Sequence, residues 1–147
     1  MSHKGTPWPW YAAAVFFFIL DRLFKNLALA HFARAVGSPA SFILFMNHGI
    51  AFSLPVPAVL FWPAAVLALL AIVTYFILSF RQDPFAAAAL FFVIVGALSN
   101  LIDRLHYNAT VDYILFFQRS AVNIADSMVV GGLLFLLLRR KNKAASH

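Results

Sequence analysis

The chain has 147 residues, of which 63% are hydrophobic and 11% are charged, and its mean hydropathy is +0.87. A soluble domain of this length cannot bury so much apolar surface, so the composition excludes a soluble globular protein and indicates a one-domain integral membrane protein. The formal net charge is +6, but basic residues cluster only after the last apolar run, from Arg139 to Lys143, which favours a cytoplasmic membrane anchor over nucleic-acid binding.

The first apolar segment is predicted as a helix over residues 11–29, and the aromatic residues at its start suit a membrane interface. A cleavable signal peptide is the alternative, because residues 28–30 read Ala-Leu-Ala, like a cleavage site. Three charged residues lie just before that site, where a signal peptide is uncharged, so a retained helix is favoured. Asp21 and Lys25 are four apart and share a helix face. Two interpretations of Asp21 and Lys25 remain open: they form an ion pair that only fixes helix packing, or they have a role at a functional site.

Residues 31–57 form a long connection in which Gly and Pro interrupt regular structure. Within it, residues 41–46 are strand-like, Asn47 begins a turn, and residues 50–53 follow the turn. A small β-hairpin or cradle is therefore expected on the outer membrane surface. Asn47 also has a common structural role in such a position, which is to cap its own turn through its side chain.

Three further membrane helices are predicted over residues 58–80, 85–104 and 122–138. The first of these has no charged residue and, at about 1.5 Å per residue, is long enough to cross a hydrocarbon core of about 30 Å. The predicted fold is thus an all-α membrane protein with four transmembrane helices, which puts both termini on one side. The distribution of basic residues predicts that this side is cytoplasmic. It carries Lys4, Arg81, Arg139, Arg140, Lys141 and Lys143, against Arg34 and Arg119 in the opposite loops.

Polar residues are expensive inside a membrane, and the predicted helices carry several of them. Five fall in the outer half of the membrane when the helical rise is counted from the inner interface: Asp21, Lys25, Asn100, Asp103 and Asp126. Helical spacing turns Arg104 to the same face as Asn100, and Asn123 to the same face as Asp126. Asp112, in the connection above, can reach the same place. A polar cluster that only holds the helices together is the structural alternative.

The residue types in this cluster favour some chemistries over others. Carboxylates suit hard cations, but Arg104 and Lys25 argue against a concentrated cation site, so no metal is expected. Ser99, Ser120 and Ser127 have no convincing histidine partner, which argues against serine catalysis, and Cys is absent. Two aspartates at one water-accessible place cannot both ionise easily, so one keeps its proton while the other activates water, as in aspartic proteases. The substrate is then a peptide bond near the outer membrane surface.

Five ordered motifs span nearly the whole chain and together resemble signal peptidase II, the bacterial lipoprotein signal peptidase. The motifs are Asp21-x-x-x-Lys25, Asn47-x-Gly49-x-Ala51-Phe52-Ser53, Gly96-Ala97-x-x-Asn100-x-x-Asp103-Arg104, Val111-Asp112-Tyr113 and Asn123-x-Ala125-Asp126. The resemblance implies a multi-pass aspartyl endopeptidase of the bacterial plasma membrane. Such an enzyme removes the signal peptide from prolipoproteins, cutting just before the diacylglyceryl-modified cysteine. Its implied partners are lipid-modified prolipoproteins and membrane lipid, with no cofactor and no nucleic acid, and it is expected to be a monomer.

The resemblance also assigns roles to residues that match the motifs. Asp112 and Asp126 match the catalytic pair, and either one can be the base while the other donates a hydrogen bond to the scissile carbonyl. Residues that line the substrate pocket are matched by Asn47 and Arg104. Polar residues that support the pair are matched by Asn100, Asp103 and Asn123. The first-helix motif, with a mainly structural role, is matched by Asp21 and Lys25.

The sequence departs from the family pattern at several positions, and an alternative function follows from this. Ser99 and Val95 stand where the family usually has Gly, which predicts looser packing of the third helix, and Val122 replaces an aromatic residue. The connection after Asp112 is shorter than usual, which puts a flap formed by its extended part in question. The alternative is a non-proteolytic membrane protein, either an inactive relative that binds lipidated peptides or a small proton-coupled carrier. A carrier of the latter kind usually shows inverted repeats, and none is visible.

Overall fold

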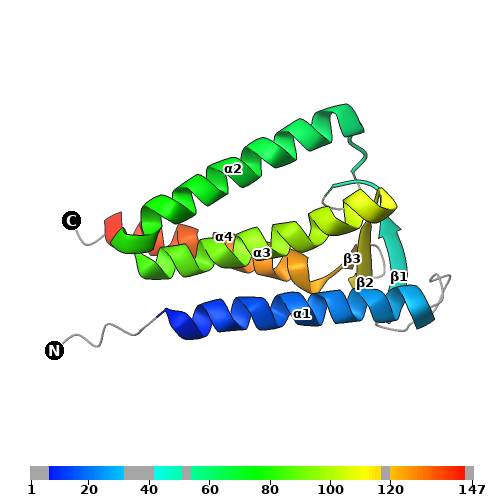
Figure 1. Ribbon diagram of the computed structural model, residues 1–147, viewed down its shortest axis with the longest axis horizontal. Helices are drawn as coiled ribbons and strands as arrows, with labels where there is room; N and C mark the ends of the chain where they lie inside the picture. The colour runs from blue at the N-terminus through cyan, green and yellow to red at the C-terminus, as the bar shows by residue number, and fades with distance from the viewer. Residues whose placement is uncertain (1–6, 32–41, 51–53, 117–119, 145–147) are drawn as a thin grey trace.

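A computed structural model describes residues 7–31, 42–50, 54–116 and 120–144. Within these ranges the chain forms α1 (Trp8–His31), β1 (Phe42–Asn47), α2 (Ala58–Gln82), α3 (Pro84–Tyr107), β2 (Thr110–Phe116), β3 (Ser120–Val122) and α4 (Ile124–Ala144). The helices run between two ends of the molecule, and the strands gather at one of them (Figure 1). The start of α1, the end of α4 and the connection from α2 to α3 lie together at the opposite end.

The helices differ in how well they suit a membrane. In the described part of the chain, α2 and α3 are long and apolar enough to cross a membrane by length and composition. Helix α1 has 24 residues and α4 has 21, but charged residues interrupt the apolar run of α1 and gather in the last turns of α4. The basic residues Lys4, Arg34 and Arg119, which the predicted orientation uses, lie outside the described residues.

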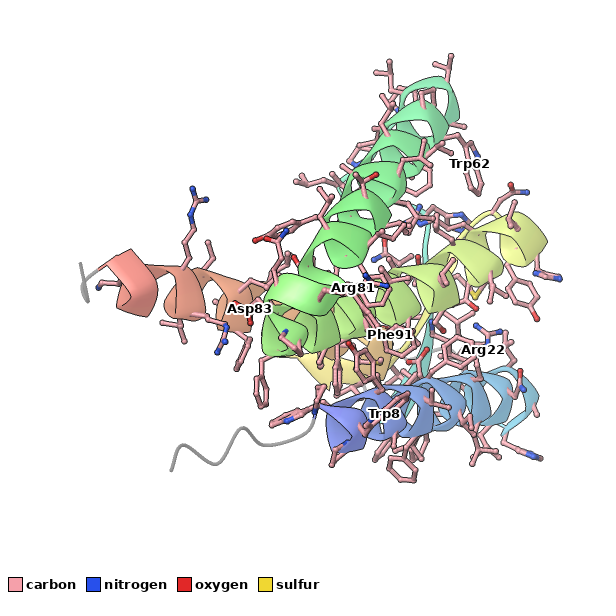
Figure 2. The ribbon with its side chains drawn as sticks, turned by 60° about the vertical axis from the view of Figure 1, so that its left-hand side comes forward. Trp8, Arg22, Trp62, Arg81, Asp83 and Phe91 are labelled. Carbon is pink, nitrogen blue, oxygen red and sulfur yellow. The ribbon has the colours of Figure 1, made fainter. Side chains whose placement is uncertain are left out.

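Helix α3 is the centre of the bundle, and α2 leans away from it. Ser79 is the one buried residue of α2, and near it Phe76 packs on Phe91 of α3 with ring centroids 6.1 Å apart. Toward the sheet, α2 diverges from α3 (Figure 1), and Trp62 projects from this divergent half (Figure 2). Helix α2 therefore packs on α3 near their connection and lies apart from it toward the sheet.

Asp83 joins three elements at the end of the bundle away from the sheet. Its carboxylate caps α3 by accepting a hydrogen bond from the backbone N–H of Ala86, and Pro84 occupies the first helical position, where no N–H is needed. The same carboxylate binds the Arg139 guanidinium of α4 at 2.8 Å. Asp83 thus has a structural role that its place in a short connection does not suggest.

The strands form one antiparallel sheet with the order β1-β2-β3. A strand over residues 41–46 is predicted and β1 lies there, but its partner is β2, with Asn47 opposite Thr110 and Phe45 opposite Asp112. Residues 51–53, in the other half of the predicted hairpin, lie outside the described residues. The observed pairing therefore joins the connection between α1 and α2 to the connection between α3 and α4. It does not form a hairpin within the first of these connections.

Burial explains why β2 takes the central place. Val111 and Tyr113 are fully buried and form a core with Ala28 of α1, and the ring of Phe24 stacks on Tyr113 with centroids 5.6 Å apart. Alternate side chains of a strand point to opposite faces, so Asp112 is turned away from this apolar core. The sheet holds Asp112 in place by burying its two neighbours.

Helices α3 and α4 approach closely at glycines. A Cβ on Gly96 would lie 2.7 Å from the carbonyl oxygen of Ala125, so only Gly fits there. The looser packing of α3 that Val95 and Ser99 predict is not found at this point. Small residues on α3, from Ala86 to Ala89, are all buried and permit the same close contact nearer to Asp83.

Two adjacent glycines of α4 provide a test of this packing. A Cβ on Gly132 would lie 2.6 Å from Val93 and 2.7 Å from the Ala89 carbonyl oxygen, whereas a Cβ on Gly131 meets nothing within 4 Å. We expect Gly132→Ala to lower the free energy of unfolding by about 1–3 kcal/mol through overpacking. Gly131→Ala should leave it unchanged or slightly higher. Thermal unfolding of both variants in the same detergent measures this, and equal midpoints would contradict the close contact.

Candidate active site

The start of α4 is held by a reciprocal pair of side-chain hydrogen bonds. The backbone N–H of Asp126 donates to Asn123 Oδ1 at 2.8 Å, and the backbone N–H of Asn123 donates to Asp126 Oδ2 at 3.3 Å. This is the geometry of a capping box, in which the residue before the helix and the third helical residue satisfy each other. One carboxylate of the predicted pair is thereby fixed by the helix end on which it lies.

Asp112 is the other carboxylate of the predicted pair, and it is 1% exposed. Its two oxygens accept hydrogen bonds from two amides, one from Asn123 Nδ2 at 2.6 Å and one from Asn47 Nδ2 at 3.1 Å. Because Asn123 Oδ1 also accepts the backbone N–H of Asp126, a single side chain binds both residues of the pair, Asp112 through its carboxylate and Asp126 through its backbone. Asp112 is therefore the point at which β2, the end of β1 and the start of α4 meet.

Asn100 links the pair to a cation on α1. Its Nδ2 donates to Asp126 Oδ1 at 2.8 Å, while its Oδ1 accepts hydrogen bonds from Lys25 Nζ at 2.8 Å and from Asn123 Nδ2 at 3.2 Å. These contacts fix the orientation of the Asn100 amide, since each atom has a partner of the right kind. The Lys25 charge is therefore brought close to the pair without contacting Asp112 or Asp126 directly.

A buried ionic cluster lies behind the asparagines. Lys25 Nζ is 2.9 Å from Asp21 and 2.8 Å from Asp103, and all three side chains are fully buried. Arg22 reaches from α1 to Asp103 and to Ser99 of α3, and it lies between these two helices in Figure 2. Among the described residues, every buried side-chain N or O atom has a hydrogen-bond partner. The cluster is thus fully satisfied, which buried charges require.

Arg104 and Asn47 both bind the backbone of Gly49, on the side of the site that faces α2. The Arg104 guanidinium donates to the carbonyl oxygen of Gly49, and it lies over the Phe61 ring of α2, 4.4 Å from the ring centroid. The N–H of Gly49 donates to Asn47 Oδ1 at 3.0 Å. The same Asn47 side chain therefore closes its own turn and binds Asp112, so the two roles considered for it coexist.

The surroundings of Asp112 favour its neutral form. Burial, and after it the nearby charge of Asp126, raise the pKa of the Asp112 carboxyl to about 7, against the opposing effect of the Asn47 and Asn123 amides. Asp126 is only partly buried, so water can approach the pair. A neutral carboxyl beside an ionised one can donate a proton while its partner accepts one. Within the described residues no group of three His, Cys, Asp or Glu side chains could hold a metal ion.

This electrostatic arrangement predicts how activity depends on pH. The active form needs one proton on the pair, and the raised pKa means that this proton is held in mildly acidic solution and lost as the pH rises through about 7. We expect kcat/KM for peptide cleavage to fall on the alkaline side of that value, because this ratio reports the titration of the free enzyme. Initial rates in buffers of constant ionic strength measure it. A rate that keeps rising to pH 9 would contradict the assignment.

The structure brings the nine predicted site residues into one continuous network of contacts. Asp21, Lys25, Asn47, Asn100, Asp103, Asp112, Asn123 and Asp126 are joined by the hydrogen bonds and ion pairs described above, and Arg104 joins through Gly49. Sequence reasoning missed Arg22 and the hydroxyls of Ser99 and Tyr113. The signal was available for Arg22, which is an unexplained cation on the charged face of a membrane helix.

Solved structures place this fold in a known class. Two bacterial membrane enzymes with solved structures align with the chain at TM-scores of 0.78 and 0.74, both at 24% sequence identity. The first alignment covers 90% of this chain and 87% of the solved one, and the second covers 95% and 97%. Four helices with a three-stranded sheet at one end are therefore a fold that bacterial membrane enzymes use.

Sequence comparison then identifies the family. The family model described as Signal peptidase (SPase) II matches residues 13–140. Proteins named lipoprotein signal peptidase are similar over most of their length: 36% identity for that of Syntrophomonas wolfei, covering 82% of this chain and 85% of the relative, and 34% for that of Teredinibacter turnerae, covering 87% and 84%. The chain belongs to the signal peptidase II family, and it is accordingly a protease located in a membrane.

Proposed function

We propose that the chain is an aspartic endopeptidase that removes signal peptides from diacylglyceryl-modified prolipoproteins at the outer side of the bacterial plasma membrane. The observation that carries the proposal is the pair of aspartates gathered on Asn123: its side chain binds the Asp112 carboxylate and the Asp126 backbone N–H, its own backbone N–H binds the Asp126 carboxylate, and Asp126 is only partly buried. Membership of the signal peptidase II family supports the substrate class. The surroundings of the pair favour catalysis over a polar contact that only joins helices, because they bring two carboxyls close enough for the charge of Asp126 to raise the pKa of Asp112.

The proposed reaction needs one proton on the pair. The ionised carboxylate takes a proton from water, whose oxygen attacks the scissile carbonyl carbon, while the neutral carboxyl donates a hydrogen bond to the carbonyl oxygen. The carbon–nitrogen bond then breaks, and the leaving nitrogen receives the proton that the base has taken. Asp112 and Asp126 share these two roles, and the proton belongs to the pair rather than to either residue.

The remaining site residues would hold the substrate and the pair. Asn47 binds Asp112, Arg104 lies against Phe61 of α2, and both are proposed to contact the peptide around the scissile bond. The framework is proposed to consist of Asp21, Lys25, Asn100, Asp103 and Asn123. These five residues bind one another, or the pair, from two helices, α1 and α3, and from the residue that precedes α4.

We propose four membrane spans with both termini in the cytoplasm. The lengths of α1 and α4 suit a span, and the charged residues of α1 are paired inside the bundle rather than turned to lipid. Arg81 and Arg139 lie at the end away from the sheet, which supports a cytoplasmic position for that end. The active site then lies near the outer surface, and the protein is proposed to act as a monomer without nucleic acid.

Cleavage of a defined precursor tests this function. Purified protein in lipid vesicles is incubated with a prolipoprotein that carries the diacylglyceryl group on its cysteine, and with the same precursor without that group. We expect a shorter product only from the lipidated precursor, with the modified cysteine at its new N-terminus by mass spectrometry. Binding of the lipidated precursor without any cleavage would contradict the proposal and favour a non-proteolytic role.

A further inference from the structure

The hydroxyl of Tyr113 connects the two segments that carry the aspartate pair. Tyr113 follows Asp112 on β2, and its hydroxyl accepts a hydrogen bond from the backbone N–H of Ile124 at 3.1 Å. Ile124 is the first residue of α4, two residues before Asp126. The tyrosine is fully buried. One hydroxyl therefore ties the strand of one aspartate to the helix end of the other.

The orientation of this hydroxyl is fixed by a carboxylate on α1. The Tyr113 hydroxyl donates to Asp21 Oδ1 at 2.9 Å, and the same oxygen accepts the backbone N–H of Ala125 at 3.1 Å. Burial and the neighbouring Asp21 carboxylate raise the pKa of the Tyr113 hydroxyl, so it keeps its proton for this bond. With its proton committed to Asp21, the hydroxyl oxygen is free to accept from Ile124.

These contacts complete the cap of α4. The first N–H groups of a helix have no partner inside the helix and need one elsewhere. Here the N–H of Ile124 binds Tyr113, that of Ala125 binds Asp21, and that of Asp126 binds Asn123. The helix end that presents Asp126 is thus held by three side chains, of which Tyr113 alone is also the chain neighbour of Asp112.

We propose that Tyr113 is a positioning residue, whose hydroxyl sets the separation of Asp112 and Asp126 by joining β2 to the first residue of α4. The proposal rests on the proposed function, because it concerns the geometry of the same reaction. It assigns a role in catalysis to a side chain that need not contact the substrate. Without the hydroxyl, the start of α4 can shift relative to the strand while both aspartates remain present.

The test is Tyr113→Phe, which keeps the ring that stacks on Phe24 and removes only the hydroxyl. We expect kcat for a lipidated precursor to fall about 10- to 100-fold with little change in KM, since small displacements of catalytic groups have effects of this size. A larger separation also weakens the repulsion within the pair, so the alkaline limb of the pH profile should move to lower pH. The charged groups that face the pair, Asp21 and Lys25 on α1 and Asp103 and Arg104 on α3, are unchanged in the variant.

Ser99→Ala is the matched control. The Ser99 hydroxyl also donates to Asp21, at 2.6 Å through the other carboxylate oxygen, but it does not contact α4. The Ser99 hydroxyl also accepts a hydrogen bond from Lys25, so we expect Ser99→Ala to lower kcat, but less than Tyr113→Phe does, and to leave the alkaline limb in place. If Ser99→Ala shifts the alkaline limb as much as Tyr113→Phe, the effect belongs to Asp21 alone and the proposal is wrong.

A second variant removes the other end of the same hydrogen bond. Ile124→Pro eliminates the N–H that Tyr113 accepts, and Pro is well tolerated at the first position of a helix. It should reproduce the lower kcat and the shifted pH profile even if Tyr113→Phe does not fold, with Ile124→Val as its control. Wild-type values of kcat and pH profile in either folded variant would overturn the proposal. An inactive wild-type protein would instead overturn the proposed function.

Discussion

Asp112→Asn and Asp126→Asn are each expected to abolish cleavage of the lipidated precursor. Each substitution keeps the shape of the side chain but removes the proton transfer that the pair provides, and loss of general acid–base catalysis typically lowers kcat by about 10²- to 10⁴-fold. Because the two carboxyls act as one unit, the double variant should be no slower than either single one. The measurement is the initial rate of product formation by gel electrophoresis, with mass spectrometry of the product.

Asp83→Asn is the control for this experiment. It is the same chemical change at a carboxylate that caps α3 and binds Arg139 at the other end of the bundle. It should cut the precursor at the wild-type rate. All variants are compared by thermal unfolding, so that an inactive protein can be distinguished from an unfolded one. Unchanged cleavage after both Asp112 and Asp126 are replaced would show that the pair is not catalytic.

Lys25→Met is expected to destabilise the protein more than any other single change considered. Lys25 is fully buried between Asp21 and Asp103, and removing the cation leaves buried carboxylates without their compensating charge. Breaking a buried ion pair in this way typically costs about 3–5 kcal/mol. Asp103 retains Arg22, so the main loss is at Asp21. Thermal or denaturant unfolding in detergent measures the effect.

Two further variants show whether charge compensation is the cause. Lys141→Met removes an exposed cation near the end of α4 and should change the free energy of unfolding by less than about 0.5 kcal/mol. Adding Asp21→Asn to Lys25→Met removes the uncompensated charge, so the double variant should be more stable than Lys25→Met. A double variant that is less stable would argue that packing, rather than charge, determines the role of Lys25.

Composition and motif order made much of the fold predictable, but the sheet pairing was not. The helices begin and end within a few residues of the predicted limits, apart from α4, which continues to Ala144 through basic residues. Strand β1 lies near its predicted position, while its partner β2 comes from a distant connection. Local turn signals favour a hairpin between neighbours. The burial of Val111 and Tyr113 against α1 instead selects β2, and this is a tertiary effect that no local pattern reports.

The candidate site was predictable in its members more than in its contacts. Depth along the helices is enough to bring Lys25, Asn100 and Asp126 together, because the helical rise is constant. The same reasoning cannot show that Asn123 binds both aspartates, since that depends on the angle at which α4 begins. Comparison with the family pattern shows Ser99 only as a departure from Gly. In the structure the buried Ser99 hydroxyl donates a hydrogen bond to Asp21.

The arrangement of charges on α1 has a consequence for the order in which the protein is made. In the proposed topology, synthesis delivers α1 to the membrane before α3, so Asp103 is absent when Arg22 and Lys25 first enter. Asp21 pairs with Lys25 on the same helix and leaves a single net positive charge on α1. That charge is neutralised only when α3 inserts and brings Asp103 to Arg22 and Lys25. In that topology, insertion of α3 fixes α1 in place, and the proposed active site is assembled only after α4 follows.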